Sequence, residues 1–434
     1  MPSIDIINLG CSKNLVDAEV LQTQLRSNGI EVRINPNPVT APTVIINTCG
    51  FISDAKEESI DTILNTIQHK GGEDGLEKVY VMGCLSQRYK IDLQKEIPEV
   101  DGYYGVDQVS ELVRDLGLSC YNDLFEKREH STPGHYAYLK IAEGCNRSCA
   151  FCSIPIIRGK QVSRSVESLV EETKHLVQDG TKELILIAQD LSSYGIDLYK
   201  KPYLVELVRE LENVDGLEWI RLHYTYPNNF PDELIELIAS SEKICKYLDI
   251  PFQHISDNML KKMRRGHGRA DSIELIKKLR KSIPDLALRT TILVGHPGET
   301  EEDFEELLDF IRDVRFDRLG VFTYSHEEGT YADKNYHDDI PQEVKAARAS
   351  KVMEIQQEIS AEINAKKPGS IERVLIDRLE DGFYIGRSQY DSPDIDNEIL
   401  IPADENDLKV GTFFDIKITS AEEFDLYGRQ APKA

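Results

Sequence analysis

The sequence lacks the segments that would send a protein into or across a membrane. The residues that follow Met1, PSIDIINLG, include an acid and no basic stretch, unlike a secretory signal peptide. No apolar run approaches the roughly 18 residues that a membrane-spanning helix needs. We therefore expect a cytoplasmic protein that has no membrane partner.

Phosphate-binding glycine loops are also missing. No tight GxGxxG turn accompanies the strand-like runs, and the glycines of LVGHPGET (293–300) are too few and wrongly spaced for a phosphate loop. The sequence therefore excludes a nucleoside triphosphatase.

Basic charge is scarce in a chain of 434 residues, which is long enough for two to four domains. The 51 basic residues stand against 76 acidic ones, and the net charge is −25. Such a surface repels nucleic-acid phosphates and attracts basic partners, so we expect no DNA partner. A role of the acids in solubility alone explains the surplus equally well.

Cysteine is the most informative residue type. Eight cysteines occur, and Cys145, Cys149 and Cys152 form a C-x3-C-x2-C array within YLKIAEGCNRSCAFCS (138–153). In a cytosolic chain, clustered cysteines bind metal or do chemistry more often than they form disulfides. Thiolates at this spacing suit zinc or an iron–sulfur cluster, and both normally take four protein ligands. Three thiolates on a four-iron cluster would leave one iron open to a small molecule. The alternative is a structural site that a distant ligand completes.

Residues 1–130 alternate between strand-like and helical segments, which predicts a parallel sheet covered by helices. Helices are expected from about Asn14 to Ser27 and from Ser53 to His69, with others after the third and fourth strands. The expected strands are IDIINLG (4–10), TVIINT (43–48), KVYVMG (78–83) and GYYGV (102–106).

The first three of these strands each lead into a cysteine, namely Cys11, Cys49 and Cys84. The carboxyl ends of parallel strands lie along one edge of a sheet, where ligands bind. A single cysteine at such a place is most often a small buried hydrophobe. Three at equivalent strand ends predict a second three-cysteine cluster site.

Residues 131–366 form a second βα series, which begins at the Pro- and Gly-containing linker STPGHY (131–136). Six βα units favour a partial TIM-like barrel that is open on one side and carries its active residues at the carboxyl ends of the strands. Cys145 follows the first of them. The expected strands are YLKIA (138–142), LILIA (184–188), WIRLH (219–223), YLDIPF (247–252), LRTTILVG (288–295) and LGVFTY (319–324).

Residues 367–434 have a different pattern of apolar and polar residues from the segment before them, about Pro341 to Lys366, which we expect to form one long polar helix. Short β-like runs separated by turns, RVLIDRL, GFYIGRS, NEILIPA and TFFDIKITSA, predict a small antiparallel barrel. From Ser370 to Ala434, fifteen acidic and seven basic residues give this barrel a net charge of −8.

The two cysteine sets and the domain order resemble the radical S-adenosylmethionine methylthiotransferases, in which a cluster domain precedes a radical core and a small barrel of the TRAM type. RLHYTYP (221–227) and GRSQYDSPDID (386–396) are similar to the branch that modifies a ribosomal protein. The other segments that carry the resemblance are LGCSKN (9–14), NTCGFI (47–52), GCLSQRY (83–89), EGCNRSCAFCSIP (143–155), RGKQVSRS (158–165) and LVGHPGET (293–300).

This resemblance implies that the chain methylthiolates the β-carbon of an aspartate in the twelfth protein of the small ribosomal subunit, free or in the ribosome. Hydrogen on an unactivated carbon is beyond acid–base catalysis, and radical chemistry is usually supplied by a cofactor. By resemblance, Cys145, Cys149 and Cys152 hold the catalytic [4Fe–4S] cluster that cleaves S-adenosyl-L-methionine to a 5′-deoxyadenosyl radical.

The same resemblance implies a second [4Fe–4S] cluster on Cys11, Cys49 and Cys84, which presents the sulfur that is methylated and transferred. It also implies a low-potential one-electron donor such as flavodoxin or ferredoxin. The acidic barrel agrees with a ribosomal-protein substrate, because ribosomal proteins are generally basic and RNA is polyanionic.

Several other residues are candidates for contact with the cofactor. They are Phe151 before the third cysteine, Gln189 and Asp190 after the second barrel strand, and Gly295 after the fifth. Turn and capping roles are the alternative for the strand-end residues. Arg158 and Arg164 serve either the cofactor and substrate or ion pairs. We expect His223 and His254 to be satisfied core or rim histidines, and Cys120 and Cys245 to be ordinary thiols.

Three other functions compete with the main hypothesis. Within the family, the alternative is a transfer-RNA adenosine methylthiotransferase. Outside it, the alternatives are a non-enzymatic iron–sulfur electron carrier and an RNA-binding scaffold, although neither needs a half-barrel that carries an open three-cysteine site.

Overall fold

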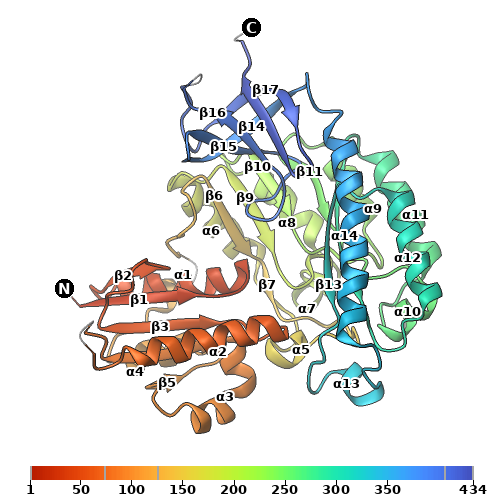
Figure 1. Ribbon diagram of the computed structural model, residues 1–434. Helices are drawn as coiled ribbons and strands as arrows, with labels where there is room; N and C mark the ends of the chain where they lie inside the picture. Colours follow the sequence, from red (N-terminus) through yellow and green to blue (C-terminus); the bar gives the residue numbers. More distant parts are fainter. Residues whose placement is uncertain (1, 73–74, 125–126, 405–406, 433–434) are drawn as a thin grey trace.

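The computed structural model describes residues 2–72, 75–124, 127–404 and 407–432, and its three main sheets follow one another along the chain (Figure 1). The first is an all-parallel sheet of order β2-β1-β3-β4-β5. Its strands are β1 (Ser3–Asn8), β2 (Glu31–Ile34), β3 (Thr43–Thr48), β4 (Lys78–Gly83) and β5 (Gly102–Tyr103). Its helices are α1 (Ser12–Arg26), α2 (Ser53–Gln68), α3 (Cys84–Glu96) and α4 (Val109–Asp115), and a short 3-10 turn, η1 (Asn122–Leu124), follows.

This sheet confirms the predicted parallel α/β arrangement, with two differences. Strand β2 was not predicted, because its four residues EVRI are too short and too polar to form an apolar run. Strand β1 ends at Asn8, so a short turn rather than the strand itself carries Cys11.

The second sheet has six parallel strands in the order β13-β12-β11-β10-β9-β6 and is not closed, as a partial TIM-like barrel requires. All six strands were predicted within a few residues of their bounds. These are β6 (Tyr136–Lys140), β9 (Glu183–Ile187), β10 (Trp219–Leu222), β11 (Ile244–Asp249), β12 (Ala287–Val294) and β13 (Arg318–Thr323).

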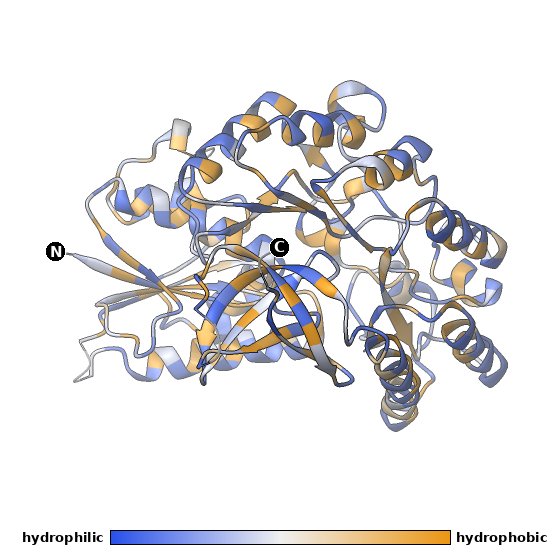
Figure 2. Ribbon diagram, turned by 90° about the horizontal axis from the view of Figure 1, so that it is seen from above, coloured by the Kyte–Doolittle hydropathy of each residue, from blue (hydrophilic) through white to orange (hydrophobic). Residues whose placement is uncertain are grey.

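Helices cover the outer face of this sheet, and their faces alternate between polar and apolar (Figure 2). Leu184 and Leu186 of β9 pack in that outer layer, whereas Ile185 and Ile187 face inward and pack with Val16 of α1. The first domain thus lies against the inner face of the half-barrel. The helices are α5 (Ile154–Ile157), α6 (Val166–Gln178), α7 (Ile196–Tyr199), α8 (Leu204–Glu212), α9 (Asp232–Ser240), α10 (Asp257–Lys262), α11 (Arg269–Ser282), α12 (Glu301–Val314), α13 (Tyr331–Asn335) and α14 (Gln342–Asn364). The remaining elements are η2 (Leu191–Ser193), β7 (Ala142–Glu143) and β8 (Val162–Ser163).

The third sheet is the closed barrel β14-β15-β16-β18-β17. It confirms the predicted barrel with two differences. Strand β18 was not predicted, and β16 and β18 pair in parallel while the other neighbours are antiparallel. After β16 the chain crosses to β17 beside β14, and β18 then fills the gap next to β16. The strands are β14 (Ile371–Glu380), β15 (Phe383–Ser388), β16 (Glu398–Pro402), β17 (Phe413–Ala421) and β18 (Asp425–Gln430). Among the described residues, no helix has the length and apolar character that crossing a bilayer demands.

Candidate active site

The first cysteine set lies along one edge of the amino-terminal sheet, as predicted. Strands β1, β3 and β4 are neighbours, and their carboxyl ends are level because Asn8 pairs with Asn47 and Thr48 pairs with Gly83. Cys11 caps α1, Cys49 follows β3 directly, and Cys84 is the first residue of α3. The structure therefore brings the three thiols to one strand-end edge.

Two asparagines and a glycine hold these turns together. The Asn14 side-chain amide donates to the carbonyls of Leu9 and Thr48, each over 3.0 Å, and Asn47 donates to the Asn14 carbonyl over 2.7 Å. Gly83 has a φ of +101°, and a Cβ there would lie 2.5 Å from the Asn47 Oδ1 atom. Only glycine allows this close approach at the residue before Cys84.

The second cysteine set lies in the loop between β7 and α5. The Cys145 amide donates to the Gly159 carbonyl over 3.1 Å, and the Cys152 amide donates to the Cys149 carbonyl over 3.2 Å. Burial raises the pKa of the Cys145 thiol to about 11 and that of the Cys152 thiol to about 12. Metal binding at such a site has to displace thiol protons, and the positive charge of the metal offsets the cost of burying thiolates.

Arg265 and Tyr226 stand beside this second set. Arg265 Nη1 donates to Cys149 Sγ over 3.1 Å, and its Nη2 donates to the Pro251 carbonyl over 2.5 Å. The Tyr226 hydroxyl donates to the Arg265 carbonyl over 2.6 Å and lies 3.8 Å from Cys149 Sγ. The guanidinium therefore lies where its positive charge can offset the charge of a metal-bound sulfur.

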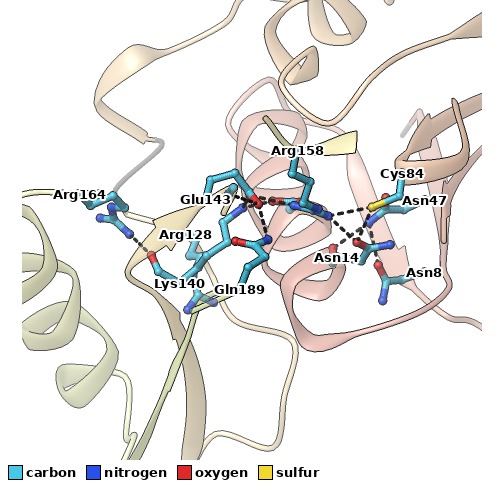
Figure 3. A network of polar contacts seen from close by, with 12 residues as sticks. Asn8, Asn14, Asn47, Cys84, Arg128, Lys140, Glu143, Arg158, Arg164 and Gln189 are labelled. Carbon is cyan, nitrogen blue, oxygen red and sulfur yellow. Dashed lines mark hydrogen bonds and ion pairs between the residues drawn. The ribbon is translucent and has the colours of Figure 1, made fainter. Parts of the chain in front are cut away.

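Arg158 reaches from the segment after the second cysteine set to Cys84 of the first set (Figure 3). It caps the short helix α5 that follows Cys152, and its Nη2 donates to Cys84 Sγ over 3.2 Å and to Asn14 Oδ1 over 2.6 Å. Its Nη1 donates to Glu143 Oε2 over 2.8 Å, and Asp17 accepts from both nitrogens over 3.2 Å. Burial raises the pKa of the Cys84 thiol to about 12, although Arg158 opposes the shift.

The donor set of each site fits an iron–sulfur cluster. All six thiols are free, and each set of three comes from one loop or one sheet edge. Within the described residues, no group of three His, Cys, Asp or Glu side chains is arranged around a single metal ion. A four-iron cluster spreads its thiolates over different irons, so they need not converge on one point.

The four candidates for cofactor contact fall at the second set or at turns. Phe151 packs in the same apolar clusters as Met259, Met263 and Tyr324. Gln189 Nε2 donates to Glu143 Oε1 over 2.7 Å, and its buried Oε1 atom has no partner among the described residues. Asp190 caps the turn η2 through the Ser192 amide.

Gly295 has a structural reason to be glycine. Its φ is +73°, and Lys345 of α14 fills the space that a Cβ would occupy, with the Lys345 Cβ atom 3.1 Å away. Its amide donates to Glu299 Oε2 over 2.5 Å. A turn role therefore accounts for this glycine in the structure.

The remaining candidates from the sequence form ion pairs or hydrogen bonds with other protein groups, or are buried in the core. Arg164 pairs with Glu172. His254 lies 3.1 Å from Glu299 Oε1 and His223 lies 2.9 Å from the Ser392 hydroxyl, so both are satisfied buried histidines, as expected. Cys120 donates to the Ser110 hydroxyl over 3.4 Å, and Cys245 is buried between the half-barrel and the small barrel.

The sequence did not single out Arg265, Tyr226, Glu143 or Lys13. Three of them lie in segments that carry the family resemblance, since Lys13 follows Cys11 in LGCSKN, Glu143 opens EGCNRSC and Tyr226 belongs to RLHYTYP. Arg265 gives no such signal, because it meets Cys149 only through packing across 116 positions of sequence.

Three segments of the chain match known sequence families. Residues 139–311 match the radical SAM superfamily, residues 3–105 match the uncharacterized protein family UPF0004, and residues 369–430 match the TRAM domain. Among solved structures, the radical S-adenosylmethionine methyltransferase TsrM from Kitasatospora setae is 15% identical with a TM-score of 0.55. The alignment covers 76% of this chain and 77% of TsrM. That likeness shows a shared fold.

Curated relatives match almost the full length. The ribosomal protein uS12 methylthiotransferases RimO of Porphyromonas gingivalis and Phocaeicola vulgatus are each 54% identical, and the alignments cover 98% of both chains in each comparison. That of Bacteroides thetaiotaomicron is 52% identical over the same share. The resemblance stated from the sequence is thereby confirmed: the chain belongs to the RimO family of ribosomal protein uS12 methylthiotransferases, within the radical S-adenosylmethionine superfamily.

Proposed function

We propose that this enzyme adds a methylthio group to the β-carbon of an aspartate in ribosomal protein uS12. Membership in the radical S-adenosylmethionine superfamily implies one [4Fe–4S] cluster and S-adenosyl-L-methionine. The finer proposal is that the chain holds two such clusters. The observation that supports it is the hydrogen bond from Arg158, which follows the second cysteine set in the chain, to Cys84 of the first set.

In this proposal Cys145, Cys149 and Cys152 hold one cluster, and Cys11, Cys49 and Cys84 hold the other. When bound, the clusters and S-adenosyl-L-methionine supply the radical and the sulfur. We assign contact with the cofactor at the second cysteine set to Phe151, Gln189 and Gly295.

The protein's own groups prepare both sites. Arg158 and Arg265 each donate to a cysteine sulfur and place a positive charge beside it. Burial of Cys84 and the tight turns around it keep water away from the sulfur. The ion pairs of Arg158 with Asp17 and Glu143 fix the distance between the two loops.

We also propose the domain limits 1–130, 131–366 and 367–434, because each range contains one of the three sheets. A low-potential donor such as flavodoxin or ferredoxin supplies the electron, and the cytoplasm, where uS12 is made, is the place of action. The substrate is a basic ribosomal protein rather than nucleic acid or membrane, in keeping with the acidic surface of the chain.

Deletion of the gene tests the proposal. Mass spectrometry of uS12 from the deletion strain should show the loss of the added CH2S mass from one aspartate, and a plasmid copy should restore it. Transfer RNA from the same strain should keep its methylthio-adenosine. The reverse pattern, modified uS12 with unmodified transfer RNA, would assign the enzyme to the transfer-RNA branch.

A further inference from the structure

Lys13 is a buried lysine without an anionic partner. Eight basic side chains are buried in the described part of the chain, and six of them pair with a carboxylate: Arg128, Arg158, Arg221, Lys345, Arg348 and Arg387. Arg265 donates to a thiol sulfur. Lys13 makes no ion pair and no side-chain hydrogen bond within the described residues.

The ring of Tyr224 is what lies against Lys13, with its centroid 3.5 Å from the Lys13 Nζ atom. Tyr224 follows β10 and holds a left-handed φ of +63°, a strained conformation for a large side chain that the surrounding structure has to enforce. A cation over an aromatic face is stabilised, but this contact does not replace a counter-charge in a buried place.

The carboxylates whose charge reaches Lys13 are bound by other groups. Glu143 accepts from Arg158 over 2.8 Å, and Asp249 accepts from Arg289 over 3.3 Å. The first turn of α1, which contains Lys13, has no acidic residue, and the capping residue Cys11 makes no side-chain hydrogen bond there. Apart from Cys11, whose sulfur belongs to the first cysteine set, no anionic group of the described chain is left to offset the positive charge of the helix start and the ammonium group.

We propose that Lys13 positions the substrate by binding the carboxylate of the aspartate that is modified. This inference rests on the proposed function and adds a specificity residue to it. The reacting β-carbon of an aspartate is bonded directly to its carboxylate carbon, so a fixed carboxylate fixes the carbon. Lys13 is two residues from Cys11, and the carbon is thereby held beside the first cysteine set.

The test measures the affinity of the reconstituted full-length enzyme for uS12 and for uS12 with the target aspartate changed to asparagine. Lys13→Met should weaken binding of natural uS12 by about 10- to 100-fold, as expected for a hydrogen bond between charged groups. The same substitution should hardly affect binding of the asparagine form, because no carboxylate is left to lose. Lys13→Arg should restore most of the affinity.

Lys95→Met serves as the matched control, because its side chain is 79% exposed in the same domain, and it should leave both affinities unchanged. An equal loss for both forms of uS12 would make Lys13 structural and overturn the inference. So would weakened binding of S-adenosyl-L-methionine with unchanged binding of uS12, since Lys13 would then hold the cofactor carboxylate.

The two proposals fail in different ways. If the unchanged enzyme modifies uS12 and Lys13→Met binds it normally, the inference about Lys13 falls alone. If the unchanged enzyme neither binds nor modifies uS12, the proposed function falls and takes the inference with it.

Discussion

Arg158 donates a hydrogen bond to the Cys84 thiol over 3.2 Å, although Arg158 follows the second cysteine set in the chain and Cys84 completes the first. The same guanidinium pairs with Asp17 of α1 and with Glu143 of β7. One buried side chain thus connects the sheet edge of the amino-terminal domain to the cysteine loop of the half-barrel.

Replacing Arg158 by methionine should destabilise the protein. The change removes one of the two cations that hold Asp17 and Glu143, and Lys140 remains as a partner of both. Breaking a buried pair outright costs about 3–5 kcal/mol, so the loss should lie below that range but above that of an exposed pair. Urea unfolding of the metal-free protein measures the loss. Arg312→Met removes an exposed pair with Asp309 and should cost about 0–1 kcal/mol. Equal losses in the two variants would contradict the proposed linking role.

The two cysteine sets should be separable by substitution. Replacing Cys145, Cys149 and Cys152 by alanine should remove about half of the roughly eight irons of the reconstituted protein and abolish cleavage of S-adenosyl-L-methionine. Iron content and release of 5′-deoxyadenosine measure these outcomes. Retained cleavage would rule out a radical role for this set.

The matching triple change of Cys11, Cys49 and Cys84 should also remove about half of the iron. It should abolish transfer of the methylthio group to uS12 while cleavage of S-adenosyl-L-methionine persists. Cys120→Ala provides the control, because that thiol donates its hydrogen bond to Ser110 and belongs to neither cysteine set, so the iron content should stay intact.

Much of the fold was predictable because its strands are short apolar runs between amphipathic helices. The spacing of apolar residues changes at each boundary between strand and helix. This change predicted the bounds of all six half-barrel strands within a few residues. Strands β2 and β18 were not predicted. Glu31–Ile34 is half polar. Asp425–Gln430 reads DLYGRQ, and its two apolar residues, Leu426 and Tyr427, are neighbours and do not alternate with polar ones.

The site was predictable where a simple rule of sequence or topology applies. Parallel strands put their carboxyl ends on one edge, so Cys11, Cys49 and Cys84 could be brought together before any coordinates. The groups that surround the thiols could not be predicted from the sequence. Arg158 reaches Cys84, and Arg265 reaches Cys149, only because distant segments pack together. Lys13 could not be singled out either. That it has no ion pair in the described part of the chain is evident only once the nearby carboxylates are seen to bind arginines.

Arg265 should tune the second cysteine set. A buried positive charge that donates to a thiolate stabilises the reduced, more negative form of a cluster, so Arg265→Met should lower its midpoint potential. A potentiometric titration followed by electron paramagnetic resonance measures this shift. Arg264→Met is the control, because Arg264 is exposed and lies over the Tyr331 ring instead. A shift of equal size in the control would argue for a general charge effect.

Docking of the small barrel should be sensitive to acid. Burial alone would raise the pKa values of Asp377 and Glu183, but Arg387, which donates to both, holds them below the usual range together with His135 and Arg221. Acids with lowered pKa values stabilise the folded state above their unfolded values of about 4, and the contribution is lost as pH falls through the folded values. The interface should therefore be unchanged from pH 7 to about 4 and weaken below that.

Trp219 is the single tryptophan and reports on this interface, because its ring lies 4.6 Å from that of Phe413 in the barrel. Its fluorescence in the metal-free protein should change in one acid transition. Arg387→Met removes the cation that lowers the pKa values of both Asp377 and Glu183, and only their other partners then act against burial. Both pKa values should rise, and the transition should move to higher pH. A transition that stays in place would show that these carboxylates do not control docking. Arg378→Met changes a half-exposed pair with Glu398 on the same barrel and should leave the transition where it is.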